Sequence, residues 1–113
     1  MTISKCSEVW LPVVGSNGHT YVSDRGRMRR GTRGPITKGG ISKDGRGNEY
    51  CRYFMAINGE RRQHPVHRLV LATFVGPCPV GCLVYHRNGN SKDNRLDNLG
   101  YVTRPMLYRL HNR

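Results

Sequence analysis

The sequence predicts a small α+β protein, in which a β-rich N-terminal module and a β-hairpin precede a C-terminal unit of two strands and a helix. Its 113 residues are enough for one compact domain or two very small ones. Fourteen glycines and six prolines leave little room for long regular elements. Helical periodicity is confined to two short stretches, while β-prone runs bounded by turn residues recur along the first half.

The N-terminal module is predicted to be a small β-meander over residues 8–30. Short β-prone pieces alternate there with turn formers, at residues 16–18 and again at residues 23–26. Residues 31–48 are mostly Gly, Lys, Arg, Ser and Thr without a helical or strand period. They are therefore predicted to be a mobile basic connector. We place the first domain at residues 1–49.

Residues 50–67 carry the pattern of a β-hairpin. Asn58 and Gly59 supply the two positive φ angles of a type I′ turn. The apolar side chains alternate before this turn, so that one face of the strand carries Cys51, Tyr53, Met55 and Ile57.

The rest of the second domain, residues 50–113, is predicted to contain two helices around two short strands. Val66, Leu69, Val70 and Phe74 recur at helical spacing, and this helix ends before Gly76. Strands are expected at residues 83–86 and 101–103, separated by a polar loop over residues 87–97. Thr103 is expected to cap a last helix that runs toward Arg113, with Pro105 in its first turn.

The charge of the chain indicates a polyanionic partner. Nineteen Lys and Arg residues against seven Asp and Glu give a net charge of +12, which is typical of proteins that bind nucleic acid. Eleven of the cations lie between residues 25 and 62. Such a run is often only a solvated surface, but its Gly-interspersed pattern favours phosphate contact. The predicted DNA contacts are Arg25, Arg27, Arg29, Arg30, Arg61, Arg62, Arg68 and Arg95.

The sequence lacks a transmembrane run and a signal peptide, which predicts a cytoplasmic protein that binds no membrane. Its four cysteines are expected to be thiols in a reducing compartment rather than a disulfide framework. Cys78 and Cys82 enclose Pro and Gly, a spacing more typical of a loop than of a zinc knuckle.

The stretch from Val84 to Thr103, within a unit spanning residues 82–113, resembles the HNH endonuclease motif. Its matching features are His86, Gly89-Asn90, Asp93-Asn94-Arg95, and Asn98 twelve residues after the histidine. Residues 67–77 are similar to the helix that precedes this motif in phage-type HNH homing endonucleases. Residues 8–30 resemble the small N-terminal DNA-binding motif that is often fused to such nucleases. The resemblance implies a ββα-metal fold for the C-terminal unit.

The resemblance implies a metal-dependent DNA endonuclease that nicks phosphodiester bonds. His86 would be the general base that activates water, a role that suits an imidazole near neutral pH. Asn98, together with Asn94, would fix the loop and orient His86, although asparagine also commonly does no more than cap turns. His67 and Arg68 are expected either to brace this unit or to touch a phosphate. One such unit cuts one strand, and family precedent implies a 5′-phosphate and a 3′-hydroxyl.

The metal ligands are the part of the motif where the sequence departs from the family. Tyr85 and Leu107 stand where relatives carry metal ligands, and a leucine cannot bind a cation. His111 lies one helical turn beyond Leu107 and is a candidate replacement, or else a frayed terminal residue. The candidate ligands are therefore His111 and Tyr85. The expected ion is Mg²⁺ or Mn²⁺, with Zn²⁺ or Ni²⁺ as alternatives.

An alternative interpretation is a protein that binds nucleic acid without catalysis. The chain would then be a catalytically degenerate HNH-like protein that binds DNA or structured RNA, and Tyr85 and Leu107 favour this reading. A basic ribosome-associated protein would fit the charge but leave the motif from His86 to Asn98 unexplained. The expected partner is DNA, with the chain a monomer or a homodimer, in the cytoplasm of a bacterial host if a phage encodes it.

Overall fold

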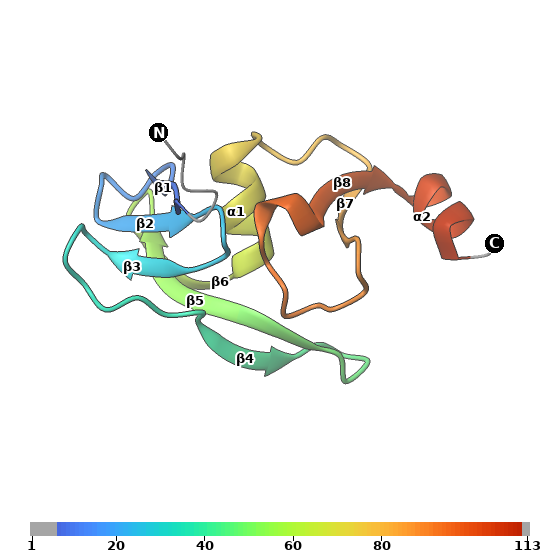
Figure 1. Cartoon of the computed structure of the whole chain (residues 1–113), viewed down its shortest axis with the longest axis horizontal. Coiled ribbons are helices and arrows are strands. Elements are labelled where there is room, and N and C mark those ends of the chain that lie inside the picture. Colours follow the sequence, from blue (N-terminus) through green and yellow to red (C-terminus); the bar gives the residue numbers. More distant parts are fainter. Residues whose placement is uncertain (1–6, 112–113) are drawn as a thin grey trace, which may run out of the picture.

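The computed structural model describes residues 7–111, with side chains as far as Arg109. The predicted N-terminal meander is confirmed (Figure 1). Its strands are β1 (Trp10–Pro12), β2 (Thr20–Ser23) and β3 (Met28–Arg30), paired antiparallel in the order β1-β2-β3. The chain turns tightly after β2 through Gly26, whose φ of 78° is one that glycine adopts without strain.

A second antiparallel sheet contains the predicted hairpin, made of β5 (Glu49–Ile57) and β6 (Glu60–Pro65). Asn58 and Gly59 have φ angles of 53° and 82°, as the predicted type I′ turn requires. Because β5 begins at Glu49, the boundary proposed between residues 49 and 50 falls one residue into this strand.

The prediction that residues 31–48 lack regular structure is wrong at their centre. Strand β4 (Gly40–Lys43) pairs antiparallel with β5 and makes a three-stranded sheet in the order β4-β5-β6. The Arg52 guanidinium also donates a hydrogen bond to the Ser42 hydroxyl across this pair. Main-chain pairing to the edge of a nine-residue strand gives order to a segment whose own composition indicates none.

The helix α1 (Val66–Phe74) packs between the two sheets and forms the core of the molecule (Figure 1). Of the apolar residues that predicted it, Val66, Leu69 and Val70 are buried, with Val66 and Val70 fully inaccessible to solvent, and Phe74 is partly buried against the same core. The core cluster around the helix contains Val13, Val22, Met28, Cys51, Met55, Leu69, Leu71 and Leu99. The N-terminal module, the hairpin and the C-terminal unit therefore share one core.

The C-terminal unit consists of β7 (Cys82–His86), a polar loop, a 3₁₀ turn over Leu96–Asn98, β8 (Leu99–Thr103) and α2 (Arg104–His111). Strands β7 and β8 pair antiparallel, with His86 opposite Leu99. The Thr103 hydroxyl accepts a hydrogen bond of 3.3 Å from the Met106 amide, which is the predicted cap of the last helix. The α+β class predicted from the sequence is therefore confirmed.

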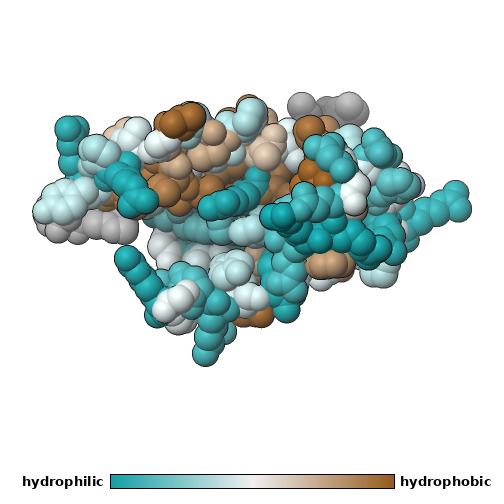
Figure 2. Space-filling model, turned by 180° about the vertical axis from the view of Figure 1, so that it is seen from behind, coloured by the Kyte–Doolittle hydropathy of each residue, from teal (hydrophilic) through white to brown (hydrophobic). Residues whose placement is uncertain are grey.

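The surface of the molecule is largely hydrophilic. Seen from behind, polar side chains cover the lower part and project from the edges, and an apolar area lies along the upper part (Figure 2). Of the helices in the described part of the chain, none is long and apolar enough to cross a membrane.

Candidate active site

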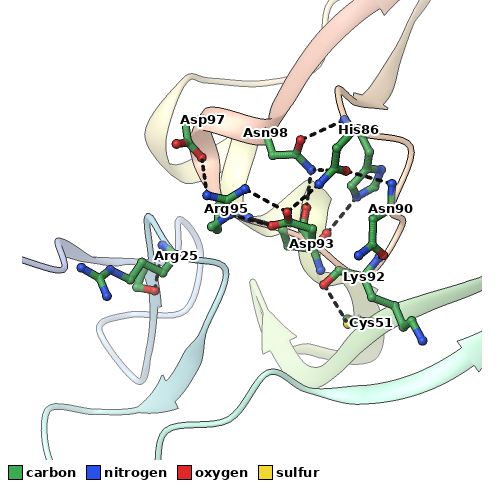
Figure 3. Close-up of polar contacts among 12 residues, drawn as sticks. Arg25, Cys51, His86, Asn90, Lys92, Asp93, Arg95, Asp97 and Asn98 are labelled. Carbon is green, nitrogen blue, oxygen red and sulfur yellow. Dashed lines mark hydrogen bonds and ion pairs between the residues drawn. The ribbon is translucent and has the colours of Figure 1, made fainter. Parts of the chain in front are cut away.

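The polar loop after β7 is tied together by the Asn98 side chain. Asn98 is 5% exposed and lies where the 3₁₀ turn ends. Its Oδ1 accepts a hydrogen bond of 3.0 Å from the Asn88 amide, while its Nδ2 donates to the Asp93 carbonyl at 2.9 Å and to the Asn88 Oδ1 at 3.0 Å. The two sides of the loop are thereby held together, as Figure 3 shows. A buried asparagine with these bonds does more than cap one turn.

His86 stands at the end of β7 and contacts the second buried asparagine of the loop. The Nε2 atom of His86 lies 2.9 Å from the Oδ1 atom of Asn94, a residue only 4% exposed. Because an amide oxygen only accepts, this hydrogen bond requires a proton on Nε2. The Nδ1 atom of a neutral His86 is then the basic nitrogen, which can accept a proton from water.

His67 packs against His86 from α1. The two ring centroids lie 5.2 Å apart in an edge-to-face arrangement. The Nδ1 atom of His67 is buried and has no hydrogen-bond partner within the described part of the chain. Burial, reinforced by the charges of His86 and Arg68, lowers the pKa of His67 to about 4. The His67 ring is therefore neutral at pH 7 and restricts the space that the His86 ring can occupy.

His86 and His67 both line an open cleft. Arg68 and Leu107 line this cleft as well, which places Arg68 where a phosphate next to His86 could reach it. The cleft is also lined by Asp44, Asn48, Glu49, Tyr50, Pro65, Val84, Gly89 and Ser91.

The donors around His86 do not form a complete metal cage. Among the side chains that the structure describes, no group of three or more His, Cys, Asp or Glu residues gathers. Tyr85 is not among the described residues that line the His86 cleft, and the side chain of His111 lies outside the described part. Mg²⁺, however, is commonly held by one or two carboxylates, water and substrate phosphates. Asp44 and Glu49 are the acidic residues that line the cleft, and the Glu49 carboxylate is paired with the Lys92 ammonium at 3.4 Å.

A second cleft lies between the N-terminal module and the loop, and it is strongly basic. It brings together Arg25, Arg27 and Arg95, three of the predicted DNA contacts. Sequence reasoning missed two further cations of this cleft, because Lys38 lies outside the arginine clusters and Lys92, although inside the motif stretch, is not one of its matching residues. Asp93 is the acid in the cleft, and its hydrogen bonds with Arg95 lower its pKa to about 2. Figure 3 shows Arg95 and Lys92 on the loop and Arg25 across from them.

The other predicted DNA contacts lie elsewhere. The Arg29 guanidinium stacks 5.0 Å from the Trp10 ring and donates to the carbonyls of Gly31 and Thr32. Arg30 is exposed at the end of β3. On β6, Arg61 stacks 5.3 Å from the Phe54 ring and Arg62 pairs with Glu60.

The neutral state of His67 predicts how stability depends on pH. In the unfolded chain a histidine binds its proton near pH 6.5, whereas folded His67 does so only near pH 4. Between these values the unfolded state binds more protons, so we expect the free energy of unfolding to fall by about 3 kcal/mol as the pH drops from 6.5 to 4. Denaturant unfolding at several pH values measures this loss. The variant His67→Gln should lose most of the slope, and an unchanged slope in it would contradict the assignment.

Comparisons with known proteins agree with this geometry. The family profile of HNH endonucleases matches residues 64–105, from the end of β6 to the start of α2. The chain is 34% identical over 94 residues to DNA endonuclease I-HmuI of Bacillus phage SP01, an alignment that covers 83% of this chain and 52% of that protein. It is 33% identical over 105 residues to the uncharacterized HNH endonuclease L247 of Acanthamoeba polyphaga mimivirus, covering 89% of this chain and 25% of that protein.

A solved structure has a similar fold. The structure described as DNA binding and cleavage by the HNH homing endonuclease I-HmuI matches with a TM-score of 0.75 and 31% sequence identity. The match covers 91% of this chain and 57% of that one. The chain thus spans about half the length of this relative and a quarter of the mimivirus protein.

Proposed function

The chain belongs to the HNH endonuclease family, and on this premise we propose that it is a metal-dependent nuclease that nicks DNA. The observation that carries this proposal is the 2.9 Å contact between the His86 Nε2 and the Asn94 Oδ1 atoms. This contact leaves the Nδ1 atom of His86 as the base, and His86 lines a cleft that is open to a phosphodiester. The relatives and the basic cleft make DNA the expected substrate.

In the proposed reaction His86 takes a proton from a water molecule, whose oxygen then attacks phosphorus. The bond between phosphorus and the 3′ oxygen breaks, and the departing 3′ oxygen takes up a proton from solvent. Asn94 fixes the tautomer of His86, and Asn98 holds the loop that carries Asn94. A bound divalent cation would supply positive charge at the phosphate during this attack. Its proposed ligands remain Tyr85 and His111, and Asp44 and Glu49, which line the cleft, are further candidates.

One chain has one such site, so we propose that a monomer nicks one strand and that a double-strand break needs two copies. The products would carry a 5′-phosphate and a 3′-hydroxyl. The binding-only alternative keeps one observation in its favour, since Leu107 lines the His86 cleft without offering a donor atom.

We expect metal removal to abolish the activity. Supercoiled plasmid should become relaxed circle with Mg²⁺ or Mn²⁺ and should stay supercoiled with EDTA, because the charge that develops on the phosphate is then not neutralised. Ni²⁺ and Zn²⁺ belong in the same series, since imidazole ligands favour them. If His111 is a ligand, His111→Ala should weaken calorimetric Ni²⁺ binding and slow nicking. Plasmid that is bound but uncut under every metal would favour the binding-only alternative.

A further inference from the structure

The turn between β2 and β3 lies directly against the loop of the active site. A methyl group placed on Gly26 would lie 2.5 Å from the Asn94 carbonyl oxygen and 2.8 Å from the Asn94 Cβ atom. Both distances are far shorter than any normal contact of a carbon atom. Only glycine permits this approach, so the sequence of the N-terminal module is constrained here by a residue almost seventy positions later in the chain.

Hydrogen bonds hold the turn rigidly in this place. The buried Ser23 hydroxyl accepts bonds from the amides of Arg25 at 3.1 Å and Arg27 at 3.2 Å. The Gly26 amide donates to the Ser23 carbonyl at 3.0 Å, which closes the turn from the other side. Because these bonds make the turn rigid, its position fixes the position of the residues that pack against it.

The turn also forms a hydrogen bond with the loop at a position after Asn94 in the chain. The Leu96 amide donates a hydrogen bond of 2.8 Å to the Asp24 carbonyl. The backbone of Asn94 is therefore in contact with Gly26, and the chain two residues later is bonded to Asp24. Asn94 itself is 4% exposed, so its backbone has little room to move away from the turn.

Asn94 connects this turn to the reacting group, because its side chain contacts the His86 ring. We propose that Gly26 is a positioning residue for catalysis: the turn of the N-terminal module sets the place of Asn94 and, through Asn94, the orientation of His86. The basic cleft crosses the same junction, with Arg25 and Arg27 on the turn side and Lys92 and Arg95 on the loop side. DNA bound in this cleft would contact both the turn of the N-terminal module and the loop that carries Asn94. The inference rests on the proposed function of His86.

The variant Gly26→Ala tests the coupling, and Gly18→Ala is its matched control. Gly18 has a φ of 74°, close to the 78° of Gly26, and lies in the preceding turn of the same sheet. A methyl group on Gly18 would meet no atom within 4 Å, whereas one on Gly26 collides with Asn94. Both variants therefore carry the same backbone strain, and only one of them displaces Asn94.

We expect Gly26→Ala to slow single-turnover cleavage at saturating protein by about 10- to 100-fold, because displacement of a catalytic group by about 1 Å has effects of this size. DNA affinity should fall much less than the rate, by no more than a few-fold relative to the control, because the substitution removes no basic side chain although Gly26 lines the basic cleft. In ¹⁵N spectra at fixed pH, the His86 imidazole should lose its single tautomer in Gly26→Ala and keep it in Gly18→Ala. If Gly26 were needed only for folding, Gly26→Ala would lower the free energy of unfolding, and the cleavage rate and the DNA affinity would fall together.

Ser23→Ala provides a second test that involves no collision. It removes the acceptor for two amides of the turn, so it should shift the same His86 signals in the same direction with a smaller loss of rate. If Gly26→Ala does not fold, the cleavage rate and the His86 spectra of Ser23→Ala test the coupling in its place. If the parent chain does not cut DNA, the proposed function fails while the His86 spectra still test the coupling. Unchanged His86 signals, together with a rate equal to that of Gly18→Ala, would overturn the inference.

Discussion

Replacing His86 by alanine is expected to reduce DNA nicking by about 10²- to 10⁴-fold, the usual effect of losing a general base. The affinity for DNA should stay within a few-fold, because the imidazole contributes little to neutralising phosphates. The two effects are measured as the rate of relaxed-circle formation at saturating protein and as binding to a labelled duplex without metal.

His19→Ala is a suitable control for this experiment. His19 is exposed in the turn that precedes β2, away from the loop, and its backbone carbonyl bond to the Gly31 amide survives the substitution. The control should cut at the rate of the parent chain. Nicking by His86→Ala at the parental rate would mean that another group activates water.

DNA binding is expected to depend steeply on salt. If about five to eight phosphates are contacted, log K should fall against log salt with a slope of roughly −4 to −7. Affinity would then drop by about 10²- to 10⁴-fold between 50 and 200 mM salt. Fluorescence anisotropy over a series of salt concentrations measures the slope, and a value near zero would contradict a basic surface as the DNA contact.

The basic cleft provides the sharper form of this prediction. Replacing Arg25, Lys38 and Lys92 together by glutamine should make the slope shallower by about 2 to 3, roughly 0.9 for each phosphate that the protein no longer neutralises. Arg27 and Arg29 are poorer choices, because the Arg27 pair with Glu8 is partly buried and Arg29 stacks on Trp10, whereas the ion pair that Lys92 forms with Glu49 is exposed. The control changes three cations that do not line the cleft, Arg33, Arg46 and Arg104. Equal slopes in the two triple variants would place the DNA-binding surface elsewhere.

Elements specified by local signals could be predicted from the sequence. The hairpin follows from Asn58-Gly59, whose positive φ angles only a few residue types adopt. The helix α1 follows from apolar residues at helical spacing that all face one core. The motif from His86 to Asn98 could also be predicted from sequence, because its residues lie in one loop and contact one another there.

Features that depend on distant parts of the chain could not be predicted in this way. Strand β4 exists because β5 offers a backbone edge, which composition does not reveal. The edge-to-face packing of His67 on His86 depends on how α1 lies against β7. Similarly, Lys38 joins Arg25 in one cleft only after the sheets pack together. The predicted ligand His111 stays a prediction, since its side chain lies outside the described part.

Treatment of the reaction product with DNA ligase tests the central claim, hydrolytic nicking by this chain, most directly. Supercoiled plasmid incubated with the protein and Mg²⁺ or Mn²⁺ should become relaxed circle, and ligase alone should then seal it to a covalently closed form. Sealing requires a 5′-phosphate next to a 3′-hydroxyl, the ends proposed for attack by water activated at His86. Plasmid that stays supercoiled with every metal, or relaxed circle that ligase cannot seal, would show that this chain does not nick DNA by hydrolysis in this way.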